Sequence, residues 1–167
     1  MFEVLAFVFE NYGGRADCPT LTTLHRTLRT VGFQGPSIIA ALSWLEDLQH
    51  ATATWTQATR ADPAPTTAAQ NAQAAMAHLT QRVLTPQESR HLGPEAWAYL
   101  CFLAQQGALS PMQLELVLDR ALAAPGNPMD VDDLKLLVLM LFWSLGTQPD
   151  GLLLDELCDA HRGRRGH

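Results

Sequence analysis

The sequence predicts a mainly α-helical protein in which an N-terminal three-helix, winged-helix-like unit is packed on or linked to a C-terminal helical bundle. Apolar residues recur at helical spacing through most of the 167 residues. Prolines and glycines mark helix starts and stops between these segments. The region after the third helix departs from this pattern and contains a candidate small β-hairpin, which would form the wing.

Three short helices are predicted in the first 50 residues. The first spans Phe2 to Tyr12 and ends at a glycine pair, because glycine adopts the left-handed capping conformation without steric cost. The second spans about Asp17 to Gly32, and the third begins at a Gly-Pro pair and spans Gly35 to about His50. The second helix has an apolar face of four residues: Leu21, Leu24, Leu28 and Val31.

The character of the sequence changes after the third helix. Ala51 to Thr56 alternates threonine with other residues and is predicted as a strand, with Gln81 to Leu84 as its partner strand. An Ala/Pro/Gln-rich insertion at about 60–77 separates them. Ala68 to Leu79 is at best a marginal helix, because little in it would anchor it to a core. Three helices followed by two strands is the order of a winged helix, so residues 1–84 are predicted as one unit.

Residues 85–161 are predicted to form the helical bundle. Four helix starts are marked: by capping boxes at Thr85 and Ser110, by a Gly-Pro pair at Gly93, and by N-terminal aspartates from Asp130. A last helix is expected over about 150–161, followed by a disordered basic tail at 162–167.

The segment Asp130 to Gly146 is the most apolar part of the chain. One helical face carries Val131, Leu134, Val138, Leu141, Phe142 and Leu145. A second face carries Leu136, Leu139, Met140 and Trp143. The apolar run is too short to span a membrane, which needs about 20 residues. Either both faces are buried in the core or the second face binds a partner, and we favour the core.

A partner-binding surface is therefore a second hypothesis for this helix. Asp130, Asp132 and Asp133 are explained by N-capping and by the positive end of the helix dipole. They could also dock a basic protein partner. The candidate partner-binding residues are Asp130, Asp132, Asp133, Leu136, Met140 and Trp143.

Charge disfavours direct nucleic-acid binding. The net charge is −6, and Ser110 to Ala160 holds nine acidic residues against two basic ones. The predicted third helix, which would enter the major groove, has no lysine or arginine and carries Glu46 and Asp47. Arg26 and Arg29, on the helix before it, are too few for the phosphate contacts of a specific binder.

No catalytic or cofactor site is predicted. The sequence lacks phosphate-binding loops and nucleophile motifs. Cys101 lies on the predicted inward face of its helix, as an inert thiol would, and Lys135 is expected to keep its amine in water. The best metal candidate, Cys158 with His161 and Asp155, lacks a fourth ligand, so no metal is expected.

Location and assembly are constrained only in part. Three widely spaced cysteines suggest reduced thiols. The apolar N-terminus has no basic region ahead of it and is not a credible signal peptide. A cytoplasmic protein is expected, with no membrane segment and an undetermined oligomeric state.

Several short stretches spread over nearly the whole chain form a recognisable set: Met1-Phe2-Glu3-Val4-Leu5, Phe9-Glu10-Asn11-Tyr12, Gly32-Phe33, Ile38, Ala41-Leu42, Trp44-Leu45-Glu46, Thr85-Pro86-Gln87-Glu88, Asp133-Leu134-Lys135 and Val138-Leu139-Met140. This set resembles the bacterial Smg family. The chain departs from it at Leu136, where the family usually has tryptophan, and in the Ala/Gln-rich segment 60–77.

The resemblance implies a helical, cytoplasmic, bacterial protein without an established biochemical activity, so it supplies no catalytic residues. It also implies a gene that commonly lies beside one for a DNA-processing protein of transformation. We therefore expect a non-enzymatic interaction or adaptor module. The alternative is a winged-helix accessory protein associated with nucleic acid, and an enzyme with a site assembled across the chain ranks third.

Overall fold

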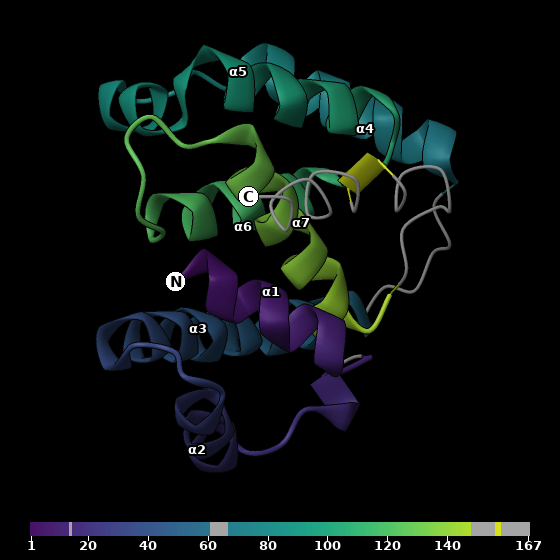
Figure 1. Cartoon of the computed structure of the whole chain (residues 1–167). Helices are drawn as coiled ribbons and strands as arrows, with labels where there is room; N and C mark the ends of the chain where they lie inside the picture. The colour runs from purple at the N-terminus through teal and green to yellow at the C-terminus, as the bar shows by residue number, and fades with distance from the viewer. Residues whose placement is uncertain (14, 61–66, 148–155, 158–167) are drawn as a thin grey trace.

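The computed structural model describes residues 1–13, 15–60, 67–147 and 156–157 (Figure 1). Within these ranges the chain is helical and contains no strand, which confirms the mainly α prediction. The elements are α1 (Phe2–Asn11), the 3-10 helix η1 (Arg15–Asp17), α2 (Leu21–Val31), α3 (Gly35–Arg60), α4 (Ala68–Gln81), α5 (Pro86–Gln105), α6 (Pro111–Leu122) and α7 (Val131–Leu145).

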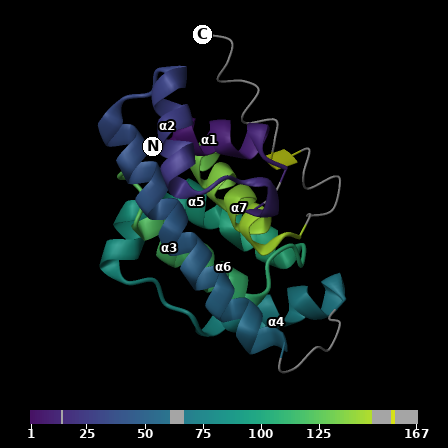
Figure 2. The same cartoon turned by 90° about the horizontal axis from the view of Figure 1, so that it is seen from below.

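The helices form three groups, and α7 lies in the central one. Figure 1 shows α4 and α5 on one side, α1, α2 and α3 on the other, and α6 and α7 between them. α7 contacts α1, α3, α5 and α6, and one continuous core includes residues from all of these helices. Figure 2 shows α3 crossing a face of the molecule, with α2 near its start and α4 near its end. None of the described helices is long and apolar enough to cross a bilayer.

Two tryptophans connect the N-terminal helices to the C-terminal ones. The indole Nε1 of Trp44, on α3, donates to the carbonyl oxygen of Arg120 at 2.9 Å. The indole Nε1 of Trp143, on α7, donates to the carbonyl oxygen of Tyr12 at 2.9 Å. A buried indole combines a large apolar area with one donor that needs a partner. The described residues before and after position 84 thus share a core, and the division of the chain into two units stays a prediction.

The predicted β-hairpin is wrong for the described residues. α3 does not stop at His50 but continues through the predicted strand 51–56 to Arg60. Its threonines donate their hydroxyls to carbonyl oxygens one turn earlier, Thr54 to His50 at 3.0 Å and Thr56 to Thr52 at 2.8 Å. Each hydroxyl is therefore satisfied inside the helix, and the weak helix propensity of threonine is overridden by packing.

Thr52 shows what holds this part of α3 in place. Its side chain is buried, and its hydroxyl lies 2.8 Å from the Ser144 hydroxyl on α7. It also lies within hydrogen-bonding distance of the Leu48 carbonyl oxygen, at 2.9 Å. A strand in this position would not present the same hydroxyl to α7, so a contact 92 residues away in sequence selects the helix.

α4 is a full helix rather than a marginal one, and the residues of the predicted partner strand form no strand. A capping box of Thr67 and Gln70 starts it, and Ala75 is fully buried. The helix continues to Gln81, the first residue of the segment predicted as the second strand. The described part of the chain therefore contains no β-hairpin that could form the wing of a winged helix.

The expectation that little anchors α4 is also wrong, because a charged cluster holds its C-terminal end. His78 Nε2 lies 2.6 Å from Glu115 Oε1 on α6. Arg82, which follows α4, places Nη2 at 3.0 Å from Glu115 Oε2 and 2.9 Å from Glu88 Oε1 on α5. Only 15% of the Arg82 side chain is exposed. We call His78, Arg82, Glu88 and Glu115 the α4 clamp.

Most of the predicted helix boundaries are confirmed. Capping boxes start α5 and α6, where Glu88 bonds back to Thr85 and Gln113 to Ser110. Gly93, with φ 72° and ψ 170°, interrupts α5 at the predicted Gly-Pro break. The predicted cap of α1 is wrong, because this helix is capped by Tyr12 in an extended conformation instead of by a left-handed glycine. The caps that end α2 and α7 are the left-handed glycines Gly32 and Gly146.

Gly107, where α5 ends, shows why a glycine is needed at one close approach. Its φ is 71°, and a Cβ there would lie 2.1 Å from the carbonyl oxygen of Ala68, the first residue of α4. Any side chain would therefore push α4 away from the turn that leads to α6.

Some predictions concern segments outside the described ranges. Residues 61–66 of the predicted insertion lie there, as do the basic tail at 162–167 and all of the last predicted helix except Glu156 and Leu157. Leu157 is fully buried in the core.

Candidate functional site

The second apolar face of α7 is buried by the chain itself. Leu136 and Met140 have no exposed surface, Leu139 is 1% exposed and Trp143 is 5% exposed. The preferred prediction, a core role for this face, is confirmed. Leu136, Met140 and Trp143 could contact a partner only if neighbouring helices moved. Their predicted role in partner binding is untested, and these side chains have almost no exposed surface in this structure.

The three aspartates at the start of α7 lie where the capping explanation puts them. An Asp130 carboxylate oxygen accepts the backbone N–H of Asp132 at 2.7 Å, and Asp132 and Asp133 occupy the first turn. Carboxylates at this position stabilise the helix, because they accept hydrogen bonds from its free N–H groups and interact favourably with the positive end of its dipole. Docking of a basic partner at the same residues remains a prediction.

Substitution of Asp130 separates these two roles. We expect Asp130→Ala to lower the free energy of unfolding by about 0.5–2 kcal/mol, because the cap of α7 is lost. Asp130→Asn should stay within a few tenths of a kcal/mol of the wild type, since asparagine caps equally well. Urea denaturation followed by circular dichroism measures both. Equal stability of the alanine variant and the wild type would contradict the capping role.

The residues considered for chemistry are accounted for by packing where they are described. Lys135 Nζ lies 3.0 Å from Glu156 Oε1 and 5.2 Å from the centre of the Tyr99 ring. Cys101 is half-buried rather than fully inward, and desolvation raises the pKa of its thiol, which disfavours the nucleophilic thiolate. The candidate metal ligands Asp155, Cys158 and His161 lie outside the described ranges. Elsewhere in the described chain no three metal-binding side chains cluster.

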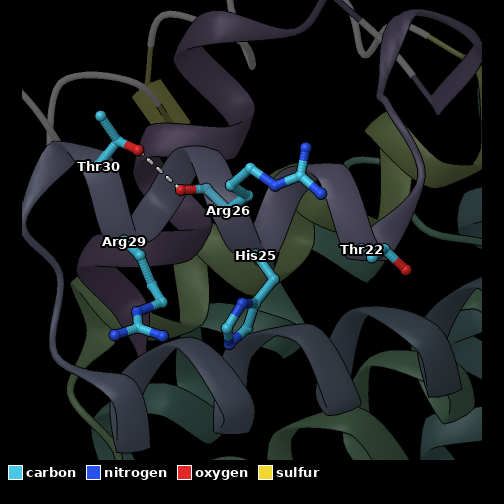
Figure 3. Close-up of a pocket in the computed structure, with 5 residues that line it drawn as sticks. All are labelled: Thr22, His25, Arg26, Arg29 and Thr30. Atoms are coloured by element: carbon cyan, nitrogen blue, oxygen red, sulfur yellow. Dashed lines mark hydrogen bonds between the residues drawn. The ribbon is translucent and has the colours of Figure 1, made fainter.

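An open pocket lies along the outer surface of α2 (Figure 3). The inward residues Leu24 and Leu28 are fully buried, so the opposite side of the helix faces solvent. The pocket is lined only by residues that can donate hydrogen bonds: Thr22, His25, Arg26, Arg29 and Thr30. We call these five residues the α2 basic face.

The side chains of the α2 basic face form two rows. Thr22, Arg26 and Thr30 are spaced four residues apart, and so are His25 and Arg29, so each row follows one line along the helix. Figure 3 shows His25 and Arg29 pointing to the same side, toward the neighbouring helix, while Arg26 points elsewhere. The Thr30 hydroxyl donates to the Arg26 carbonyl oxygen at 3.0 Å.

Both arginines of this face are available for binding. Neither guanidinium forms an ion pair or hydrogen bond with any described residue, whereas Arg82 and Arg120 each pair with two carboxylates. The sequence from Cys18 to Leu45 contains no aspartate or glutamate. In a chain with a net charge of −6 the α2 basic face is thus a local positive surface.

Two large aliphatic side chains are exposed close by in the sequence. Val31, the last residue of α2, is 52% exposed, and Ile39, near the start of α3, is 63% exposed. They flank the turn between the two helices. Val31 was predicted to share the apolar face of Leu24 and Leu28, which is wrong, because its side chain, on the last residue of α2, is largely exposed.

A family model described as a protein of unknown function (DUF494) matches residues 1–167. A protein named as an Smg homolog from Methylibium petroleiphilum is 40% identical over 157 residues, which cover 94% of this chain and 93% of the relative. The chain belongs to the Smg family. The Smg homolog from Leptothrix cholodnii is 39% identical over the same shares of both chains. The Smg homolog from Bordetella pertussis is 34% identical over the full length of both.

Membership of the Smg family confirms the resemblance inferred from the sequence, and no solved structure matches the chain. Sequence reasoning considered Arg26 and Arg29 only as nucleic-acid contacts and set them aside. The signal it missed was the acid-free stretch from Cys18 to Leu45 around them. Only the folded structure shows that neither guanidinium group has a partner among the described residues.

Proposed function

We propose that this Smg-family chain is a non-enzymatic, cytoplasmic interaction module that uses the α2 basic face to bind a partner protein. The observation that carries the proposal is the pair of solvent-facing arginines, Arg26 and Arg29, without partners among the described residues. A guanidinium group binds carboxylates through two parallel hydrogen bonds, so it is well suited to recognise an acidic partner.

The non-enzymatic part of the proposal rests on the sequence, which contains no phosphate-binding or nucleophile motif. The partner-binding part rests on where the arginines lie. Both guanidinium groups project from a helix whose opposite side is anchored in the core by Leu24 and Leu28. Such a surface is displayed on a rigid element and needs no rearrangement before a partner binds.

Nucleic acid is the second candidate, because phosphates also bind arginines. Two arginines supply few of the contacts on which phosphate-driven affinity depends. The next helix, α3, presents exposed Glu46 and Asp47, which would repel the phosphate backbone of a nucleic acid. A protein partner needs only the local positive surface, and we therefore prefer it.

The test is photo-crosslinking in cells of the native host, with a photoreactive amino acid in place of the exposed Thr22. We expect a discrete crosslinked protein with the otherwise wild-type chain and its loss with Arg26→Glu/Arg29→Glu. Arg90→Glu is the matched control, since Arg90 is exposed on α5, well outside the α2 basic face. Unchanged crosslinking in the double variant would refute the proposed site.

Two further measurements keep the result interpretable. Circular dichroism of the double variant should match that of the wild type, since exposed substitutions usually change stability by no more than about 0.5 kcal/mol. A crosslink to nucleic acid alone, identified by nuclease sensitivity, would favour the second candidate over the proposed one.

A further inference from the structure

The spacing of donors on the α2 basic face limits what can bind to it. Residues four apart on a helix are separated by about 6 Å along its axis. Arg26 and Thr30 have this spacing, and so do His25 and Arg29. Side chains on one face of an extended peptide recur every two residues, about 6.5–7 Å apart. Carboxylates at alternate positions of an extended segment therefore match the spacing within either row, and a segment that crosses from one row to the other places a carboxylate on each arginine.

The arrangement differs from a site for one small anion. Figure 3 shows the Arg26 side chain directed away from those of His25 and Arg29, so the two guanidinium groups do not converge on a point. A single phosphate or carboxylate could contact only one of them. A ligand with several separated negative groups gains from both arginines at once.

Two exposed aliphatic residues lie close to this face in the sequence. Val31 follows Thr30 directly, and Ile39 lies beyond the turn at the start of α3. Large apolar side chains that stay exposed on a folded domain often mark contact surfaces when polar groups border them. A partner segment that carries one large apolar residue beside its acids would cover them.

We propose that the α2 basic face binds a short, extended, acidic segment of a partner protein, with carboxylates on Arg26 and Arg29 and an apolar side chain against Val31 and Ile39. This inference rests on the proposed function and names the chemistry of the partner. A long polyanion fits less well, because its ends would meet the acidic remainder of the chain. A second copy fits less well because two chains of −6 repel each other at long range.

Fluorescence anisotropy with defined probes on the full chain tests the inference. The first probe is a labelled nine-residue peptide with glutamate at alternate positions and one leucine near its C-terminus. The second replaces every glutamate with glutamine, the third replaces the leucine with serine, and the fourth is a nine-nucleotide oligothymidylate. The proteins are the wild type, Arg26→Gln/Arg29→Gln, Ile39→Ser and the control Arg90→Gln.

We expect the glutamate peptide to bind the wild type and Arg90→Gln equally, and to bind the double variant at least about tenfold more weakly, because charge-assisted hydrogen bonds are lost. The glutamine peptide should not bind measurably. The serine peptide should bind the wild type more weakly than the leucine peptide, and Ile39→Ser should remove most of that difference. Added salt should weaken binding of the glutamate peptide.

Three outcomes would overturn the inference. They are equal affinity of the double variant for the glutamate peptide, tighter binding of the oligothymidylate than of that peptide, and arginine-dependent self-association of the chain without any probe. If the glutamate peptide fails but the crosslink in cells still depends on Arg26 and Arg29, the proposed function stands and only the acidic, extended character of the partner is wrong.

Discussion

Met140→Ala is expected to lower the free energy of unfolding by about 2–5 kcal/mol, because it leaves a cavity in the centre of the core. Met140 has no exposed surface and lies on the face of α7 that could have served a partner. Met112→Ala is the matched control, since Met112 is 58% exposed at the start of α6 and should change stability by no more than about 0.5 kcal/mol.

The measurement is urea denaturation of both variants, monitored by circular dichroism at 222 nm. For each variant, the dependence of the unfolding free energy on urea concentration is compared with that of the wild type. A side chain reserved for a partner would contribute little to the stability of the isolated chain. Equal effects of the two methionine substitutions would therefore contradict the burial of this face and restore the partner-binding hypothesis for α7.

Arg82→Met is expected to destabilise the chain by about 1–3 kcal/mol at pH 7, because it leaves Glu88 and Glu115 without their shared cation. The range is below that of a fully buried pair because the Glu115 side chain is 40% exposed and solvent screens it. Arg90→Met is the matched control, since among the described residues the exposed Arg90 donates only to the Pro86 carbonyl oxygen in its own helix.

The same clamp predicts a pH dependence. Hydrogen bonds from Arg82 lower the pKa of Glu88 to about 2, and they also lower that of Glu115. A carboxyl with a depressed pKa in the folded state stabilises the fold above its unfolded pKa of about 4.3, and this contribution disappears as the pH falls toward the folded value. The stability difference between wild type and Arg82→Met should therefore shrink from pH 5 to pH 2.

Denaturation curves at pH 7, 5, 4 and 3 measure this difference directly. A constant gap between wild type and Arg82→Met across that range would contradict stabilisation of the fold by the charge of the arginine.

The amount of this fold that can be read from the sequence depends on how local each signal is. The capping boxes at Thr85 and Ser110 and the aspartate cap of α7 involve atoms three or fewer residues apart, so the residues themselves define these helix starts. The candidate site was only partly predictable. Arg26 and Arg29 are visible in the sequence, but their lack of partners depends on where every nearby acid folds.

The sequence by itself determined the helical class, the family and the positions where most helices begin and end, because these depend on local hydrogen bonds, on glycine and proline, and on apolar spacing. Only the tertiary structure decided that α3 continues through the threonine-rich segment and that α4 is firmly held. The first depends on the Thr52–Ser144 contact and the second on Arg82 with two glutamates. These partners lie far apart in the sequence, and local propensity carries no information about their meeting.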